Sequence, residues 1–382
     1  MHILFISRGY PSERRPQNGN FEVDQAEGLA KLGHKVSMIS VDLGREFIPK
    51  EYGIHRIKNN GVTAYTICLT PTKFFAIKGI FKQLRDRQLD FLYKKIVRQF
   101  GKPDILYAHY LWNMDWALYL KDKYNIPLVG IEHWSELGYE DIKPFIANHA
   151  QRIYPQLDGL ITVSHALQKK IEERFGIHSD VVFNTIHDSI RMHSKPSKAD
   201  NIVRFITVGS LLPVKGYDTL IQAFSQCSLP KDQWTLSIVG KGPEAETLNN
   251  LIHQYHLEKN IHLTGRKNKP EIVELLNSSD VFISSSHLET FGVAALEAIC
   301  CGVPVLSTDS GGPREFITST NGRLCKDSVE ALKEGIEYMY AHYAEFDKKR
   351  MSEEAVGRFS STAIARQLEA IFKKSLSNVD KN

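Results

Sequence analysis

The stretch S-S-S-H-L-E-T-F-G-V-A-A-L-E-A-I-C-C-G-V-P, residues 284–304, decides the fold. The apolar run 281–283 precedes it and predicts a buried strand, and a helix is expected over 291–301. Gly302 stands where a helix C-cap favours positive φ, and a further strand is expected from 303 to 306. This order of strand, loop, helix and strand is the repeating unit of an α/β sheet.

Two carboxylates bracket the turn in this unit, Glu289 in the loop and Glu297 in the helix. The loop follows the carboxyl end of its strand, where open α/β sheets bind ligands, and the helix N-terminus offers N–H groups to phosphate. Glu297 has apolar neighbours, and a carboxylate is costly to bury without a partner. The pattern therefore favours an anionic ligand with sugar hydroxyls, although Glu297 as a solvated helix residue is the alternative.

The two glutamates continue into Gly302-x-Pro304 and then Asp309-x-Gly311-Gly312-x-x-Glu315. This combined pattern resembles the retaining nucleotide-sugar glycosyltransferases of family 4. The resemblance implies an α/β chain with the GT-B fold, in which two Rossmann-like domains have parallel sheets that face across a cleft. It also implies catalysis without a metal or another cofactor, and the sequence contains no D-x-D triplet of the kind that metal-dependent transferases use.

A chain of 382 residues is too long for one ordinary core, so two domains are expected. We place an acceptor-side domain at 1–185 and a donor-binding domain at 186–358, and the resemblance implies that a terminal helix within 359–382 packs back on the first. Five cysteines form no C-x-x-C pair, and no apolar run reaches the ~18 residues of a membrane span. These features predict a cytoplasmic protein.

Three residues of the first domain follow expected strands. Gly19 lies in the loop after the first strand, and by resemblance this loop approaches the donor diphosphate. His109 and His133 end two later strands, 104–108 and 126–131, and both are expected to face the ligand. The resemblance implies that these histidines contact the donor sugar or the acceptor. The alternative for each is a hydrogen-bonded structural histidine.

The second domain opens with G-S-L-L-P-V-K-G at 209–216, which resembles the family pattern G-R-L-x-x-x-K-G. Lys215 matches the lysine that holds the donor diphosphate. Ser210 replaces the usual arginine, so another group must supply that contact. Arg266 follows a later strand, near where the family holds the nucleotide base.

The resemblance also gives roles to residues in the stretch 284–304. The backbone of Phe291, Gly292 and Val293 is expected to face the transferred sugar, together with Glu289. Glu297 is expected to bind the ribose hydroxyls. Glu289, His109 and His133 are therefore the candidate catalytic residues.

A basic stretch, 73–102, contains nine Lys or Arg residues and two Asp residues, and phenylalanines are interleaved with them. Its net charge of +7 exceeds the +4 of the whole chain. Such a helix suits an anionic membrane surface, and a solvated charged face is the alternative. The family commonly acts on glycan or polyprenyl-diphosphate-linked acceptors, which would bring the protein to the inner face of the membrane.

The sequence therefore predicts a retaining glycosyltransferase that uses a UDP- or GDP-sugar to build cell-surface polysaccharide, with no nucleic-acid partner. A nucleotide-sugar epimerase of the same fold remains an alternative. An NAD-dependent oxidoreductase is another, because Gly240-Lys241-Gly242-Pro243-Glu244-Ala245 formally matches G-x-G-x-x-A. A non-catalytic sugar-binding module is the third. Nucleotide release that depends on an acceptor would separate the glycosyltransferase from these three alternatives.

Overall fold

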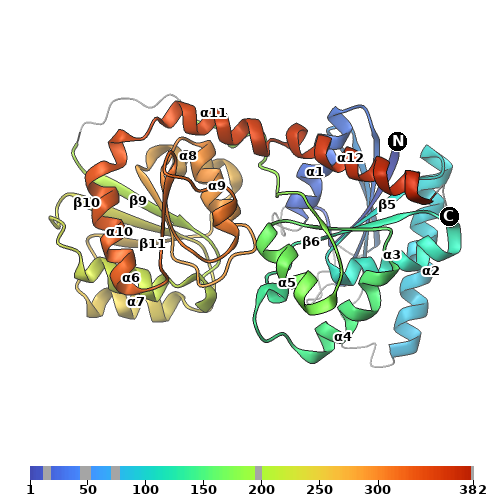
Figure 1. Cartoon of the computed structure of the whole chain (residues 1–382), viewed down its shortest axis with the longest axis horizontal. Coiled ribbons are helices and arrows are strands. Elements are labelled where there is room, and N and C mark those ends of the chain that lie inside the picture. The colour runs from blue at the N-terminus through green and yellow to red at the C-terminus, as the bar shows by residue number, and fades with distance from the viewer. Residues whose placement is uncertain (12–18, 44–52, 70–77, 194–199, 380–382) are drawn as a thin grey trace. The chain divides into compact units, whose positions relative to one another are not determined.

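A computed structural model describes residues 1–11, 19–43, 53–69, 78–193 and 200–379. The chain divides into two compact units. The first unit comprises Met1–Thr185 together with Ser361–Asn382, and the second comprises Ile186–Ser360. Figure 1 shows that each unit is built from one sheet with helices around it.

The first unit has an eight-stranded sheet in the order β3-β4-β2-β1-β5-β6-β7-β8. Its strands are β1 (His2–Ser7), β2 (Lys35–Leu43), β3 (Gly53–Asn59), β4 (Val62–Leu69), β5 (Ile105–His109), β6 (Leu128–Glu132), β7 (Gly159–Thr162) and β8 (Asp180–Val181). All neighbouring pairs are parallel except β3 with β4. All six residues of β1 are buried, because helices cover both faces of a parallel sheet.

Helices of the first unit are α1 (Asn20–Lys31), α2 (Lys78–Phe100), α3 (Leu111–Tyr124), α4 (Pro144–Ile153), α5 (His165–Phe175) and α12 (Ser361–Val379), with 3-10 turns η3 (Ser135–Gly138) and η4 (Tyr154–Gln156). The last helix, α12, lies along α1 (Figure 1). The approach is close at Gly28, where a Cβ atom would lie 2.3 Å from the carbonyl oxygen of Ser361. Further along α12, the ring of Phe372 packs 4.9 Å from that of Tyr107.

The second unit has a six-stranded, all-parallel sheet in the order β11-β10-β9-β12-β13-β14. Its strands are β9 (Val203–Val208), β10 (Trp234–Val239), β11 (Ile261–Gly265), β12 (Val281–Ser284), β13 (Val305–Thr308) and β14 (Gly322–Cys325). The helices are α6 (Tyr217–Gln226), α7 (Ala245–Gln254), α8 (Lys269–Ser278), α9 (Val293–Cys300), α10 (Val329–His342) and α11 (Lys348–Phe359), with 3-10 turns η5 (Pro213–Lys215), η6 (Gly312–Glu315) and η7 (Tyr343–Glu345).

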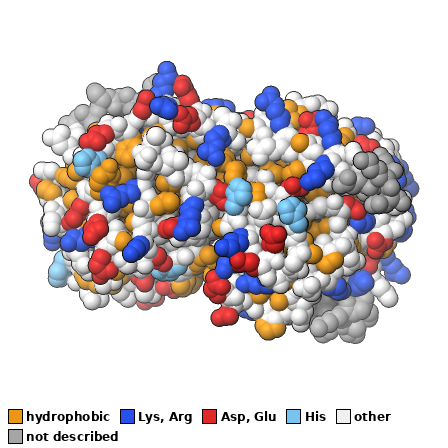
Figure 2. Space-filling model, in the orientation of Figure 1, with side chains coloured by type: hydrophobic (Ala, Val, Ile, Leu, Met, Phe, Trp, Pro, Cys, Tyr) orange, Lys and Arg blue, Asp and Glu red, His pale blue; other side chains and the backbone are white. Residues whose placement is uncertain are grey.

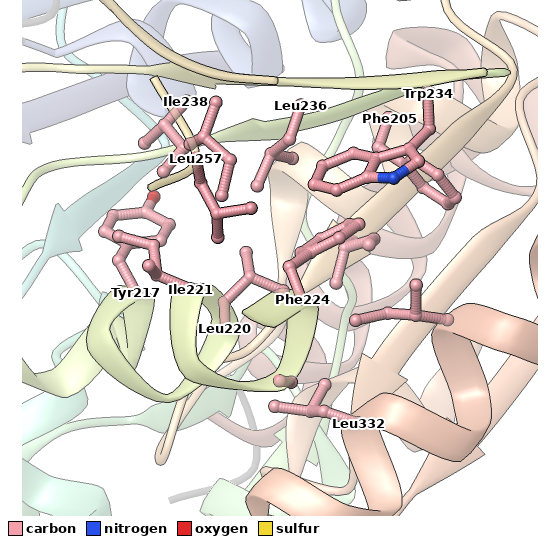
Figure 3. Packing of buried hydrophobic residues seen from close by; sticks show 14 of the residues in the cluster. Phe205, Tyr217, Leu220, Ile221, Phe224, Trp234, Leu236, Ile238, Leu257 and Leu332 are labelled. Atoms are coloured by element: carbon pink, nitrogen blue, oxygen red, sulfur yellow. The ribbon is translucent and has the colours of Figure 1, made fainter. Parts of the chain in front are cut away.

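A hydrophobic core lies between α6 and the sheet of the second unit (Figure 3). Phe224 of α6 stacks on Trp234 of β10 at 4.7 Å, and it meets Phe205 of β9 edge-on at 5.2 Å. Leu220 and Ile221 of α6 extend the same cluster. Burial of such side chains contributes about 1.5–3 kcal/mol each, which holds the strand ends and their loops in place.

Two segments differ from the sequence-based expectation. The edge strand β3 goes unpredicted because its side chains are mostly exposed and it lacks an apolar run. The run Val181-Val182-Phe183-Asn184 predicts a strand, whereas the structure has only the two-residue β8, Asp180–Val181, at this place. The helix expected from 359 is α12, which begins at Ser361, and a separate helix, α11, ends at Phe359. Between them, the carbonyl of Phe359 accepts from the N–H of Ile186 at 2.9 Å, whereas in a continuous helix it would accept from the N–H of the residue four positions later.

The charged side chains visible in Figure 2 are of both signs and are interspersed over that face. None of the helices in the described part of the chain combines the length and the apolar character needed to cross a bilayer.

Candidate active site

The loop after β12 is held by close backbone contacts to the loop after β13. The N–H of Glu289 donates to the carbonyl of Ser310 at 2.9 Å, and the N–H of Gly312 donates back to Glu289 at 2.9 Å. A Cβ atom on Gly312 would lie 2.3 Å from the backbone of Phe291, so only glycine fits there. These contacts fix the chain that leads into α9.

The start of α9 depends on Gly292, which caps the helix with φ of 92°. The side chain of Phe291 is buried against Phe316, with 5.3 Å between ring centroids, so only its backbone can serve a ligand. Val293 begins the helix and is half-buried. N–H groups in a first helical turn have no carbonyl of an earlier turn to pair with, so this end of α9 can accept an anion.

Lys215 and Glu289 form an ion pair at the carboxyl edge of the sheet. The ammonium group of Lys215 donates to Oε1 of Glu289, and the hydroxyl of Ser286 donates to the same oxygen at 3.0 Å. The hydroxyl of Ser285 donates to the carbonyl of Lys215 at 2.8 Å. Gly216, with φ of 59°, would place a Cβ atom 2.2 Å from the carbonyl of Ser285. The structure thus brings together two residues that the sequence assigned to one ligand.

The other predicted residues of this unit are also at strand ends or on α9. Ser210 follows β9 and Arg266 follows β11, and both are exposed at the carboxyl edge of the parallel sheet. Glu297 is half-buried one turn into α9, as the spacing predicts. Gly302 follows the end of this helix with φ of 70°, which confirms the positive φ expected there.

The G-x-G element of the second unit has a packing role. A Cβ atom on Gly240 would lie 1.8 Å from the carbonyl oxygen of Gly209, and one on Gly242 would lie 2.2 Å from that of Leu211. The N–H of Leu211 also donates to the carbonyl of Lys241 at 3.2 Å. The two glycines therefore allow the loops after β9 and β10 to touch. This contact accounts for both of them without a dinucleotide.

In the first unit, the loop after β1 returns to the start of α1 at Gly19. Its φ is 77°, and a Cβ atom there would lie 2.2 Å from the carbonyl oxygen of Gly9. The residues between, 12–18, lie outside the described part. Arg8 donates from Nε to Glu22 at 3.2 Å, and its guanidinium lies 3.8 Å from the centroid of the Tyr110 ring.

His109 and His133 are stacked, with 5.3 Å between ring centroids and 8° between planes. Nδ1 of His133 lies 2.9 Å from Oδ1 of Asn184. Because an amide oxygen only accepts, Nδ1 of His133 carries a proton, and its Nε2 accepts from Nδ1 of His109 at 3.2 Å. Burial, with the charge of Arg8, lowers the pKa of His133 to about 3, and burial also lowers the pKa of His109 well below its usual value.

Burial of the histidines corrects one expectation. Both were expected to face a ligand, but His109 is fully buried, and His133, stacked on it, is buried as well. Both ring nitrogens of His133 are engaged, so a ligand would meet its ring or displace one of these hydrogen bonds. Tyr110, which follows His109, has φ of 70°, a strained value for a residue other than glycine. Its ring lies 5.0 Å from that of His133.

Glu132, which ends β6, is a residue that the sequence-based reasoning left without a role. Its carboxylate is fully buried and accepts four hydrogen bonds. The donors are the N–H groups of His133 and Trp134 at 3.0 Å, the N–H of Leu111 at 3.0 Å and the hydroxyl of Tyr154 at 3.1 Å. Burial raises the pKa of Glu132 to about 7, although these hydrogen bonds favour its charged form. Its position directly before His133 is the one sign in the sequence that could have identified Glu132 as part of the site.

The basic stretch differs from its prediction at one residue. Arg85 of α2 is buried and pairs with Asp86 at 2.6 Å and with Asp115 at 3.4 Å, so it cannot meet a membrane. Residues 73–77 of the stretch lie outside the described part. Within that part, no group of three or more His, Cys, Asp or Glu side chains is placed to hold a metal ion.

Comparisons with known proteins agree with this arrangement. The family model "Glycosyl transferases group 1" matches residues 188–356, and "Glycosyltransferase Family 4" matches residues 21–189. The N-acetyl-alpha-D-glucosaminyl L-malate synthase of Bacillus anthracis is 27% identical over 93% of this chain and 92% of its own.

Two solved structures share the fold. Sucrose-phosphate synthase from Thermosynechococcus elongatus superposes with a TM-score of 0.79 at 18% identity, over 99% of each chain. Anabaena HepE, in complex with UDP and glucose, has a TM-score of 0.71 at 20% identity, over 98% of this chain and 100% of its own. The chain therefore belongs to the group 1 glycosyltransferases of family 4 and has their GT-B fold of two Rossmann-like units.

Proposed function

We propose that this glycosyltransferase is a retaining enzyme that moves a sugar from a UDP- or GDP-sugar to a glycan or lipid-linked glycan, without a metal ion. The observation that carries the proposal is the ion pair between Lys215 and Glu289 beside the start of α9. It supplies a cation and N–H groups for a diphosphate, and a carboxylate for sugar hydroxyls.

Donor binding would rearrange this pair. The diphosphate carries more negative charge than Glu289, so it competes for the Lys215 ammonium and frees the carboxylate for the transferred sugar. The backbone of Phe291, Gly292 and Val293 lies next along the chain and would face the same sugar. Glu297 would accept from the ribose hydroxyls. HepE, a protein of the same fold, binds UDP and glucose, which supports this class of donor.

The first unit would supply Gly19 and the two histidines. His133 is neutral at physiological pH because its pKa is about 3, so it would orient a sugar without adding charge. The leaving diphosphate carries the charge that develops in the transition state, and Lys215 would stabilise it there. Attack on the same face, assisted by the departing phosphate, would retain the anomeric configuration. Ser210 and Arg266 would complete the nucleotide end of the site.

A cytoplasmic location at the inner face of the membrane is part of the proposal. On α2, the side chains of Lys82, Arg87, Lys94 and Arg98 are exposed and could meet anionic lipid. Each basic residue near such a surface contributes about 1 kcal/mol. A polyprenyl-diphosphate-linked acceptor would then be within the same plane as the enzyme.

The test is nucleotide-sugar binding by calorimetry, with UDP-glucose and GDP-mannose as probes. Lys215→Ala should weaken binding about 10- to 150-fold, since a charge-assisted hydrogen bond contributes about 1.5–3 kcal/mol. Lys241→Ala is the matched control, because Lys241 is an exposed lysine in the neighbouring loop. Equal binding by the wild type and Lys215→Ala would contradict the donor site. Product NMR that shows an inverted anomer would contradict retention.

A further inference from the structure

A cluster of aromatic side chains lies on the first unit beside His133. We call it the aromatic patch, and it consists of Trp112 of α3, Trp134 of the loop after β6, and Phe145 and His149 of α4. The ring of Trp112 lies 6.3 Å from Phe145 at 26°, 6.1 Å from Trp134 and 4.4 Å from His149. Trp112 is therefore the centre of the patch.

The patch is open to solvent, unlike the aromatic core of the second unit. Phe145 is 58% exposed, and Trp112 and Trp134 are half-buried. Folding alone does not explain a large exposed aromatic side chain that stacks on a tryptophan at the surface, whereas a ligand would cover it. Aromatic rings of this kind bind at low entropic cost because they have only two side-chain torsions.

A buried carboxylate holds the patch in place. Oε1 of Glu132 accepts from the N–H of Trp134 at 3.0 Å, and Oε2 accepts from the N–H of Leu111 at 3.0 Å, one residue before Trp112. One side chain thus anchors the backbone of Trp134 and the backbone of the residue before Trp112. Glu132 also accepts from the N–H of His133 at 3.0 Å, so the patch and His133 share that anchor.

The rim of the patch is polar and close to neutral. Asp115 pairs with Arg152 at 3.2 Å, and Glu136 pairs with Lys143 at 3.2 Å. Anionic lipid gains little from a surface in which each cation is matched by a carboxylate. A pyranose ring suits it better, because its axial C–H bonds form an apolar face for an aromatic ring while its hydroxyls meet carboxylate and guanidinium groups at the rim.

We infer that the aromatic patch binds a pyranose ring of the acceptor glycan through stacking on Trp112 and Phe145. The inference rests on the proposed transferase function, because Trp134 follows His133 directly in the chain and Tyr110, two residues before Trp112, packs 5.0 Å from that histidine. A sugar on the patch would therefore lie next to a candidate catalytic residue. Trp112, Trp134 and Phe145 become specificity-determining contacts for the acceptor.

The test uses saturation-transfer NMR on the full chain with methyl glycosides of glucose, galactose, mannose and N-acetylglucosamine. At least one glycoside should bind, and Trp112→Ala and Phe145→Ala should each weaken it about threefold to tenfold. Tyr338→Ala is the control, since Tyr338 is an aromatic side chain 39% exposed on α10 of the other unit. Phe145→Ala keeps the test decisive if Trp112→Ala fails to fold, because Phe145 is mostly exposed.

Three results would overturn the inference. One is that no glycoside binds the wild type, and another is that both patch variants bind as the wild type does. The third is that Phe145→Ala loses only binding to phosphatidylglycerol vesicles, which would make the patch a membrane contact. UDP-glucose binding separates the two proposals. Glycoside binding without any nucleotide-sugar binding leaves the patch and removes the transferase function, and the reverse result removes only the patch.

Discussion

The amide oxygen of Asn184 lies 2.9 Å from Nδ1 of His133 and thereby selects the tautomer of that ring. Nε2 is left to accept, and Nδ1 of His109 lies 3.2 Å from it. Because the amide is uncharged, it holds the proton on Nδ1 without stabilising a second proton on the ring. The neutral imidazole of His133 therefore depends on a residue that comes 51 positions later in the chain.

Asn184→Asp should raise the pKa of His133, because a carboxylate at this position stabilises the imidazolium form. We expect the acidic limb of the activity profile to move to higher pH, with transfer retained above it. NMR titration of His133 measures the shift directly. Asn184→Ala is the companion variant, which should loosen the ring without raising its pKa. An unchanged titration in Asn184→Asp would contradict the assigned tautomer.

His133→Gln should change how stability depends on pH. The lowered pKa of His133, about 3, means that its contribution is complete above 6.5 and is lost as the pH falls towards 3. Glu132, with its raised pKa of about 7, acts in the opposite sense, and its contribution is lost as the pH rises from 4.5 towards 7. In the wild type, the contributions of His133 and Glu132 to the pH dependence of stability therefore oppose each other between pH 4.5 and 6.5.

Removal of His133 should therefore leave Glu132 unopposed. The slope of unfolding free energy against pH should fall by about 1.4 kcal/mol per pH unit over this window, which is the limit for one titrating group. Urea unfolding at four pH values between 4.5 and 6.5 gives the slope. Parallel curves for wild type and variant would show that His133 is not held neutral by the fold.

Gly312→Ala should destabilise the second unit by about 1–3 kcal/mol, because the added methyl group meets the backbone of Phe291. The shift would also move Glu289, so UDP-glucose binding should weaken. Thermal unfolding and calorimetry measure the two effects. Gly357→Ala in α11 is the control, as nothing lies within 4 Å of its Cβ position. That change should stabilise the helix by about 0.5–1 kcal/mol.

Replacing Lys82, Arg87 and Lys94 with glutamate should abolish binding to phosphatidylglycerol vesicles at low salt, because it reverses the exposed charge of α2. Donor hydrolysis should be unchanged, since the proposed donor site is in the second unit. Vesicle co-sedimentation checks the binding. The same change at Lys231, Lys259 and Lys349 controls for total charge, and loss of binding in both triple variants would mean that α2 has no special role.

The α/β architecture could be predicted because buried parallel strands are short apolar runs followed by Gly-rich loops. Residues at strand ends were placed correctly for the same reason, as with Lys215 and Glu289. Their direct ion pair could not be predicted, since it depends on β9 lying beside β12 in the sheet. Strand order is set by packing between distant segments, and local patterns do not record it.

Other features escaped prediction because one residue type fits opposite environments. In the sequence, Arg85 looks like one more exposed cation of a basic helix, yet its side chain is buried and pairs with Asp115. Glu132 at the end of an apolar strand looks like a surface charge, yet its four hydrogen-bond donors come from three separate segments. The patch around Trp112 likewise requires α3 and α4 to be neighbours in space, which no spacing in the sequence reveals.

The last helix, α12, has a consequence for how the protein is made. The second unit is inserted between two parts of the first, so a ribosome completes the second unit before it releases Ser361–Val379. Until then, the surface of α1 at Gly28 and the ring of Tyr107 lack the partners that cover them. The amino-terminal unit therefore finishes folding last, although its sheet is synthesised first.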